Sequence, residues 1–190
     1  MLAMSFYCLK APGHAVHHSY HEREYGFPQA DERKLFERMA LEIFQAGLSW
    51  EIVLKKRAAT VKAFHKFDVN RVAKYKATDV KRLLANPGII RNRLKVLALI
   101  ENARRLQALR KSHGGLAKFI EAHHPLTKKE WTKLFKKQFK FMGGEIVGEF
   151  LMSIGYLPGA HGEKCPVYKR LKKDYDLPWH KARKKGFKYI

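Results

Sequence analysis

The amino-acid sequence predicts an all-α fold of about eight helices, and three features of the chain support this. From about residue 31 onward apolar residues recur every three or four positions, polar caps and glycines bracket these stretches, and no alternating strand pattern competes. With 190 residues, 46% of them hydrophobic, the chain can bury a single core. We therefore expect one helical domain over residues 1–165, including an N-terminal lead-in, and a basic C-terminal tail over residues 166–190.

The first predicted helix follows Asp31, a good N-cap, and ends at Gly47, with apolar pairs repeating every four residues between them. Each of the next three helices begins at a polar cap: Ser49, Asp68 and Thr78. In the longest helix, over residues 92–112, we expect six apolar residues to face inward: Leu94, Leu97, Ala98, Ile100, Ala103 and Leu106. The last three helices cover residues 116–122, the segment behind the capping box Thr127-Lys128-Lys129-Glu130, and residues 144–155.

The two ends of the chain differ from this helical body. Residues 1–30 hold four histidines among glycines and prolines and are expected to form an irregular lead-in. Residues 166–190 carry nine lysines or arginines and two aspartates. A disordered arm that binds phosphates and a terminus that only aids solubility are equally consistent with that composition.

Charge is the strongest compositional signal. Lysine and arginine outnumber aspartate and glutamate by 39 to 17, which gives a formal net charge of +22. Such an excess repels itself unless a polyanion screens it, so nucleic acid is the leading partner and an anionic membrane surface a distant second. No apolar run approaches the ~18 residues of a membrane span, and we expect no secretory signal. Two cysteines make no disulfide framework, which favours a reducing compartment.

Glu42 is the first residue that suggests chemistry. It falls at the edge of the apolar stripe of its helix, where a carboxylate is partly desolvated and needs a partner. A structural ion pair with one of the many basic residues would satisfy it. The following segment, however, turns through Gly47 and brings Trp50 about two turns from the acid. An acid beside aromatic rings can grip a flat, cationic, hydrogen-bonding ligand.

A glycine turn near the C-terminal end is the second candidate. Gly143 and Gly144 stand between a basic helix and the next one, and Lys140 lies just upstream. Glycine at a helix start lets a phosphate oxygen approach unpaired backbone N–H groups, where the helix dipole favours an anion. An ordinary helical hairpin would also use such a turn.

Four residues could together bind a metal ion. His161 and Cys165 form a compact chelating pair, and Cys8 and His21 could complete a tetrahedral zinc site that ties the two ends together. Lone cysteines are more often buried thiols. Five other histidines compete as ligands with no better spacing: His14, His17, His18, His123 and His124.

The same positions resemble a known family. The chain from about Cys8 to Cys165 is similar to DNA-3-methyladenine glycosylase I, of the helix-hairpin-helix superfamily. Segment 41–50, ending in Gly-Leu-Ser-Trp, is the most specific. The other segments that carry the resemblance are residues 20–26, 53–57, 88–92 and 139–143, and the His161 to Cys165 spacing.

The resemblance implies a monofunctional base-excision repair enzyme that flips 3-methyladenine out of alkylated double-stranded DNA and hydrolyses its N-glycosidic bond. It implies that Glu42 hydrogen-bonds the damaged base, that Tyr20 and Trp50 stack on it, and that structural zinc binds Cys8, His21, His161 and Cys165. Tyr25 would form another wall of the base pocket, and Leu48 would fill the vacated stack. Lys140, Gly143 and Gly144 would contact DNA. We expect a cytoplasmic, nucleoid-associated protein with no obligate protein partner and no membrane contact.

Two departures from the family concern the pocket. Lys10 and Tyr25 stand where family members often have tryptophan, so the range of substrates could differ. A rival hypothesis is a non-catalytic, zinc-stabilised DNA-binding protein that kept the fold. Glu42, Tyr20 and Trp50 together favour the enzyme, because phosphate binding alone requires none of them.

Overall fold

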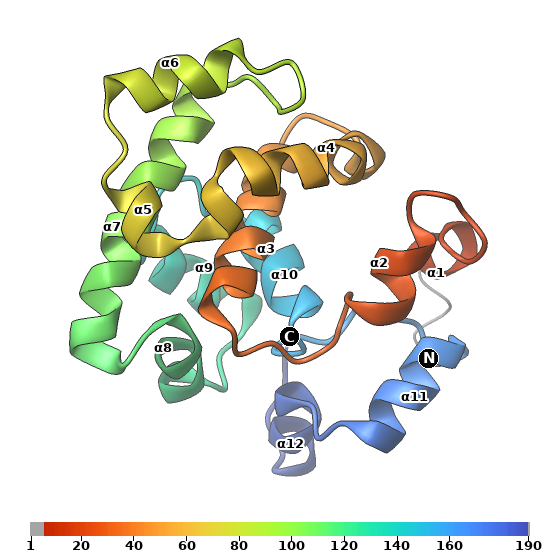
Figure 1. Ribbon diagram of the computed structural model, residues 1–190. Coiled ribbons are helices and arrows are strands. Elements are labelled where there is room, and N and C mark those ends of the chain that lie inside the picture. Colours follow the sequence, from red (N-terminus) through yellow and green to blue (C-terminus); the bar gives the residue numbers. More distant parts are fainter. Residues whose placement is uncertain (1–5, 190) are drawn as a thin grey trace.

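The computed structural model describes residues 6–189, and all the regular secondary structure in that range is helical, with no β-strand (Figure 1). It contains twelve α-helices and one 3-10 turn, η1, at His65–Phe67. The helices are α1 (Phe6–Lys10), α2 (His18–Arg23), α3 (Glu32–Gln45), α4 (Trp50–Ala63), α5 (Val69–Ala73), α6 (Ala77–Ala85), α7 (Arg93–His113), α8 (Leu116–His123), α9 (Lys128–Gln138), α10 (Gly144–Ser153), α11 (Pro166–Asp174) and α12 (Pro178–Lys184).

The all-α prediction is confirmed, but the expected number of about eight helices is too low. Helices α3 to α10 correspond one by one to the predicted helices. The four additional helices are α1 and α2 in the expected irregular lead-in, and α11 and α12 in the expected basic tail. They have only five to nine residues each, and each carries only one or two buried residues, too few for a repeating apolar pattern. Tertiary packing rather than an amphipathic repeat therefore stabilises them.

Most predicted helix starts are correct, because the polar side chains accept hydrogen bonds from the first-turn backbone N–H groups as expected. Five residues cap in this way: Asp31, Ser49, Asp68, Asn92 and Thr127. Thr78 is not a cap. Helix α6 already begins at Ala77, and its first turn is closed by the Asp79 carboxylate, which accepts from the Lys76 N–H at 3.1 Å.

The main core surrounds α3, which contacts α4, α7, α8 and α10. Ten consecutive residues of α3, from Leu35 to Phe44, are buried, so this helix is covered on all sides. Leu94 and Leu97 of α7 do not face this core as expected; their exposed fractions are 63% and 37%. The other four expected residues, Ala98, Ile100, Ala103 and Leu106, are buried. The buried face also includes Val96 and Leu99.

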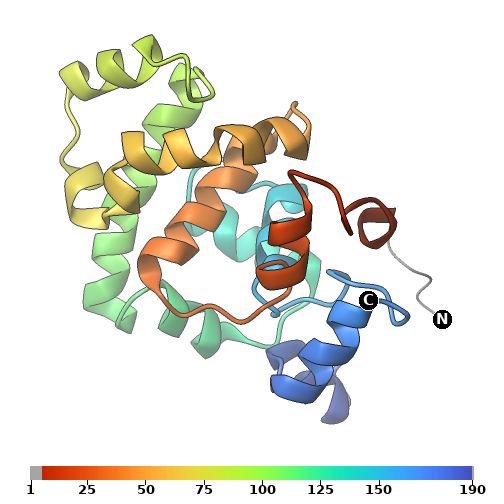
Figure 2. The ribbon, with the colours of Figure 1, turned by 45° about the vertical axis from the view of Figure 1, so that its right-hand side comes forward.

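A second, smaller apolar cluster joins the two ends of the chain. It contains Cys8 of α1 together with residues of the C-terminal segment: Cys165, Val167, Leu171, Leu177 and Trp179. Figures 1 and 2 show α11 and α12 below the N-terminal helices, far from α6. Residues 166–184 thus carry two short helices whose apolar side chains are buried. None of the described helices is both long and apolar enough to cross a membrane.

Candidate active site

A cavity of about 290 Å³ lies where α1, α2, α3 and α10 meet the start of α4. Four residues singled out from the sequence line it: Tyr20, Tyr25, Glu42 and Trp50. Five more lining residues were not anticipated: Tyr7, Gln45, Glu149, Met152 and Gly159. Helices α2 and α10 lie close together in both ribbon views, and residues of both line the cavity although they are more than a hundred positions apart in the sequence (Figures 1 and 2).

Aromatic rings form one side of this cavity. The rings of Tyr20 and Trp50 have centroids 5.1 Å apart with an interplanar angle of 63°. Tyr20 also lies 5.7 Å from Tyr25, and Tyr7 lies 5.5 Å from Tyr25 in an edge-on arrangement. Tyr20 and Tyr25 are buried, whereas Trp50 is partly exposed. The rings offer flat apolar surfaces of the kind on which a nucleobase stacks.

Glu42 is 4% exposed, and within residues 6–189 its side chain makes no hydrogen bond or ion pair. Within the described residues, Glu42 therefore does not form the structural ion pair that was one of the two alternatives for it in the sequence analysis. Burial raises the pKa of Glu42 well above its usual range, and repulsion from Glu149 adds to this, while Arg38 opposes it. A carboxyl group held unpaired in an aromatic cavity is available for a ligand that carries positive charge or hydrogen-bond donors.

A buried ion-pair network holds the segment that carries Tyr20 and Tyr25. Arg57 of α4 binds both carboxylate oxygens of Glu24 at 2.7 Å and Glu37 at 2.7 Å. Burial raises the pKa of Glu24, but the hydrogen bonds from Arg57 together with the positive charges of Arg57, Arg38 and Lys34 outweigh burial and lower it. Arg38 donates to the Glu24 carbonyl at 2.7 Å and lies 5.8 Å from the centre of the Tyr20 ring. Glu24 of segment 20–26 and Arg57 of segment 53–57 therefore help to position the rings.

The turn between α3 and α4 is fixed by Lys95, a residue that sequence reasoning missed. Its ammonium group is buried and donates to the carbonyls of Phe44 at 3.0 Å and Ala46 at 2.6 Å, so it caps the C-terminal end of α3. Gly47 has a φ of +83°, which favours glycine. The turn leaves Leu48 39% exposed, next to Trp50 at the start of α4.

The glycine turn before α10 lies where the sequence predicts it. Gly143 is the N-cap residue of α10, Gly144 is its first residue, and Lys140 is exposed. Asn102 of α7, fully buried, holds the turn in place: it accepts from the Lys140 N–H at 2.8 Å and donates to the Lys140 carbonyl at 3.1 Å. The turn therefore presents its lysine and its helix start on a fixed backbone.

Cys8, His21, His161 and Cys165 are all buried, and their ligand atoms lie within 4.8 Å of one another. The Cys8 sulfur is 3.5 Å from Nδ1 of His161, and the Cys165 sulfur is 3.6 Å from the same nitrogen and 3.8 Å from Nε2 of His21. Zinc–sulfur and zinc–nitrogen bonds of about 2.3 and 2.05 Å give a tetrahedral S···N edge of about 3.5 Å. These four residues could therefore hold a tetrahedral metal ion.

The outer nitrogens of the two histidines support this fit. Nδ1 of His21 donates to Glu22 at 2.8 Å, and Nε2 of His161 donates to the Tyr25 carbonyl at 2.7 Å. Each ring is thereby held with its other nitrogen toward the cluster, which is the usual arrangement around metal-binding histidines.

Among the described residues, one other group has ligand atoms within 4.8 Å of one another: His14, His17 and Glu51. It fits a metal less well, because Nδ1 of His14 accepts backbone N–H bonds from Val16 at 3.1 Å and His17 at 3.4 Å. A metal on the other nitrogen would require a proton on Nδ1. His18, His123 and His124 bond elsewhere and join neither group.

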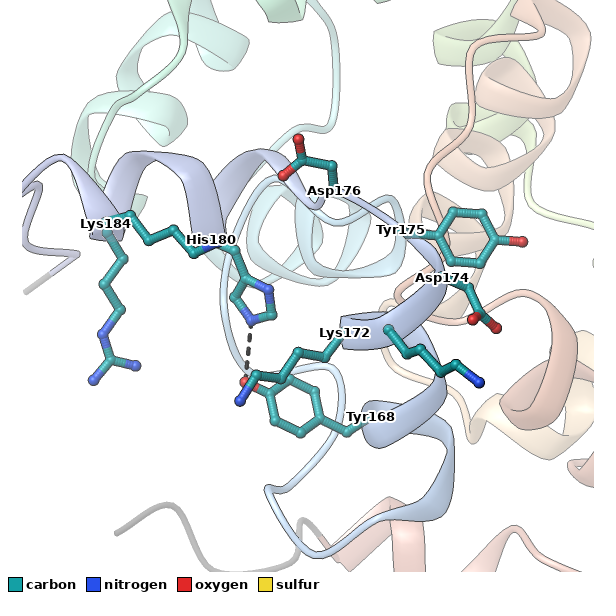
Figure 3. A pocket seen from close by; sticks show the side chains of 9 residues that line it. Tyr168, Lys172, Asp174, Tyr175, Asp176, His180 and Lys184 are labelled. Carbon is teal, nitrogen blue, oxygen red and sulfur yellow. Dashed lines mark hydrogen bonds between the residues drawn. The ribbon is translucent and has the colours of Figure 1, made fainter.

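A wider pocket of about 630 Å³ lies between α11 and α12 (Figure 3). Tyr168 and His180 meet across it, with the tyrosine oxygen 3.1 Å from Nε2 of His180. Lysine and aspartate side chains surround this pair, among them Lys172 and Asp176. This pocket has no buried carboxyl group, so the cavity around Glu42 is the better candidate for an active site.

Comparison with known proteins agrees with this geometry. The model of the methyladenine glycosylase family matches residues 10–168. The chain belongs to this family. Two curated members of the family are similar to this chain. DNA-3-methyladenine glycosylase of Haemophilus influenzae is 37% identical over 80% of this chain and 92% of that protein. DNA-3-methyladenine glycosylase 1 of Escherichia coli is 36% identical over 79% of this chain and 90% of that protein.

Solved structures of the same family share the fold. A crystal structure of 3-methyladenine DNA glycosylase I superposes with a TM-score of 0.75 at 36% identity, covering 83% of this chain and 96% of the other. A single-residue variant of such an enzyme, solved in complex with 3-methyladenine, gives a TM-score of 0.76 at 30% identity and covers 84% and 96%. The terminal helices after residue 168, including most of α11, lie outside the family match.

Proposed function

We propose that this protein is a DNA-3-methyladenine glycosylase of base-excision repair. Its reaction is hydrolysis of the bond that joins 3-methyladenine to deoxyribose in alkylated double-stranded DNA. The observation that carries the proposal is the buried, unpaired Glu42 carboxyl group in an aromatic cavity, in a chain that belongs to the methyladenine glycosylase family. Two curated relatives of similar length are named as DNA-3-methyladenine glycosylases.

The chemistry that the site must provide is modest. Methylation at N3 makes the base of the nucleotide cationic, so the base departs with the electrons of the glycosidic bond as neutral 3-methyladenine. Water then adds to the sugar carbon and releases its proton. Glu42, when ionised, attracts the cationic base, while Tyr20, Tyr25 and Trp50 hold the extruded ring.

The site favours a narrow, monofunctional enzyme. The loop after α10, residues 156–160, offers no carboxylate that could help to expel a neutral, poor leaving group. No lysine is among the residues that line the cavity in the described part of the chain, so strand cleavage through a Schiff base has no nucleophile there. Positively charged alkylated purines are therefore the expected substrates.

DNA binding is assigned to the turn before α10 and to the turn after α3. Lys140, Gly143 and Gly144 would contact a phosphate through the lysine charge and the backbone N–H groups at the start of α10. Leu48, exposed beside the cavity, would fill the space that the flipped nucleotide leaves. The net charge of +22 suits double-stranded DNA as the partner, with no obligate protein partner.

The metal is assigned as structural zinc. Two thiolates and two imidazoles are the ligand set that zinc prefers, and the S···N distances of 3.5 to 3.8 Å fit a tetrahedral ion. Zinc there would link the N-terminal helices to the loop before α11. It would act on the fold and take no part in the reaction.

We assign residues 1–165 to the glycosylase domain and residues 166–190 to a basic C-terminal extension. The extension carries nine lysines or arginines and two aspartates, which would raise DNA affinity and its salt dependence. The protein would work in the cytoplasm on the DNA of the nucleoid.

The test is a product analysis with the wild-type protein. Duplex DNA treated with a methylating agent is incubated with the protein, and the released bases are separated by chromatography. Release of free 3-methyladenine is the expected result, and the amount of N7-methylguanine shows whether the cavity also accepts other cationic purines. Tight binding of the same DNA without release of any base would instead identify a non-catalytic DNA-binding protein.

A further inference from the structure

Glu149 brings a second carboxyl group into the cavity that contains Glu42. It lies on α10, which packs against α3, and lines the same space of about 290 Å³. The hydroxyl of Tyr25 donates a hydrogen bond to Oε2 of Glu149 at 2.9 Å, so the carboxyl group has a fixed position. The sequence did not single out this residue.

Neither carboxyl group has a cationic partner inside the cavity. Within the described chain, Glu42 and Glu149 form no ion pair. Arg38, the cation that acts on Glu42, is committed to the carbonyls of Glu24 and Ser153. Lys128, the cation that acts on Glu149, pairs with Glu145 at 2.9 Å. The other side chains of the cavity are uncharged: Tyr7, Tyr20, Tyr25, Gln45, Trp50 and Met152.

We propose that Glu149 is a second specificity residue, which acts with Glu42 to make the cavity select a positively charged base over a neutral purine. This proposal rests on the proposed function, because it assigns the cavity to an extruded nucleobase. Two like charges that share a cavity repel each other, and a cation bound in that cavity is attracted by both of them. Stacking surfaces and hydrogen bonds alone would not discriminate in this way, because neutral adenine offers the same rings and amino group.

The protonation of the two groups is consistent with this role. Burial raises the pKa of Glu149, as does the nearby Glu145, whereas the hydrogen bond from Tyr25 and the charge of Lys128 lower it. Burial and the charge of Glu149 both raise the pKa of Glu42. The empty cavity therefore favours protonated carboxyl groups, and a bound cation favours ionised ones.

The experiment compares two small ligands that differ in charge. The 3,9-dimethyladeninium ion carries a methyl group in place of the sugar and is permanently cationic, whereas 3-methyladenine is neutral at pH 8. Their affinities are measured by calorimetry at pH 8 for the wild type, Glu149→Gln and Glu121→Gln. The glutamine in Glu149→Gln can still accept the hydrogen bond from Tyr25. The control variant Glu121→Gln removes an equal charge from the exposed surface of α8, outside the cavity.

We expect Glu149→Gln to weaken binding of the cation about ten- to a hundredfold, as expected for charges several ångströms apart at an effective dielectric constant of about 20. Binding of neutral 3-methyladenine should change by less than about threefold, and Glu121→Gln should change neither. Tyr25→Phe, which removes the hydrogen bond to Glu149 but keeps its charge, should reduce the preference for the cation over neutral 3-methyladenine by a smaller factor. An equal loss for both ligands, or an unchanged preference for the cation, would overturn the proposal.

The same proteins are assayed for base release, which separates this proposal from the proposed function. A wild type that prefers the cation through Glu149 but releases no base would contradict only the glycosylase activity. A wild type that releases 3-methyladenine while Glu149→Gln retains the full preference would contradict only the role of Glu149. A wild type that binds neither ligand would overturn the assignment of the cavity and the role of Glu149 together.

Discussion

The sulfur of Cys8 lies 3.5 Å from Nδ1 of His161, although the two residues are 153 positions apart. This contact belongs to the cluster of Cys8, His21, His161 and Cys165, which adjoins the cavity that contains Glu42. Cys8 directly follows Tyr7 and His21 directly follows Tyr20, and both tyrosines line the cavity. Nε2 of His161 donates to the carbonyl of Tyr25, the third tyrosine of that wall. A change in the cluster should therefore move the rings that hold the base.

Metal analysis should return about one zinc per chain, as a single tetrahedral site requires. Removal of zinc by a chelator should lower the melting temperature by about 10 °C, because a loss of about 3 kcal/mol or more has that effect in a protein of this size. Cys165→Ser should do the same, while His18→Ala, an exposed histidine of the same region, should leave the zinc content unchanged. A stably folded protein isolated without metal would contradict this prediction.

Lys95→Met should destabilise the protein and slow base release together. The methionine keeps the apolar stem but leaves the carbonyls of Phe44 and Ala46 without their donor, at a cost of about 2 kcal/mol. The turn that carries Leu48 would then lose its support. Denaturant unfolding and the rate of base release measure the two effects. Lys111→Met, near the exposed end of α7, is the control and should change neither; equal behaviour of the two variants would count against the role of Lys95.

Asn102→Ala should loosen the turn before α10. Its amide makes two hydrogen bonds with the backbone of Lys140 in the core, so its loss should cost about 2–3 kcal/mol of unfolding free energy. If this turn contacts DNA, the affinity for undamaged duplex should also fall, as a gel-shift or anisotropy titration would measure. Gln107→Ala, on the same helix but with its amide at the surface, provides the comparison. Unaltered DNA affinity in Asn102→Ala would exclude the turn as a major contact.

Glu42 should make the stability of the protein depend on pH. Its pKa is raised in the folded state by burial and by Glu149, so the protonated form is the favourable one. That contribution is complete below the ordinary glutamate pKa of about 4.5 and is lost as the pH rises through the raised value. Glu42→Gln should match the wild type near pH 5 and exceed it by about 1–2 kcal/mol at pH 9. Parallel stability curves for the two proteins would contradict this.

The helices that could be predicted are those with a clear cap and an apolar repeat. Asp31 and Ser49 mark α3 and α4 correctly, because capping depends on residues within one turn. The short helices α1, α2, α11 and α12 could not be predicted, since their apolar residues make contacts across the whole length of the chain. Leu94 and Leu97 were misplaced because the periodicity of α7 does not indicate which part of the helix other elements cover.

For the site, the sequence identified residues whose type is unusual for their position. Glu42 stood out as an acid at the edge of an apolar stripe, and it lines the cavity. Glu149 had a comparable signal, since it lies on α10 between buried residues such as Val147 and Phe150. Lys95 and Asn102 also stand among apolar positions of α7, but the backbone groups that they bind are near them only in the folded chain, so the sequence did not show their role.

The central claim is that the buried Glu42 carboxylate, beside the aromatic rings, selects the cationic base. The most direct test is single-turnover release of 3-methyladenine from alkylated duplex DNA by the wild type and by Glu42→Gln. We predict that the variant is folded, keeps its affinity for undamaged DNA, and releases the base at least about a hundredfold more slowly. A folded Glu42→Gln protein that releases 3-methyladenine at the wild-type rate would contradict the claim.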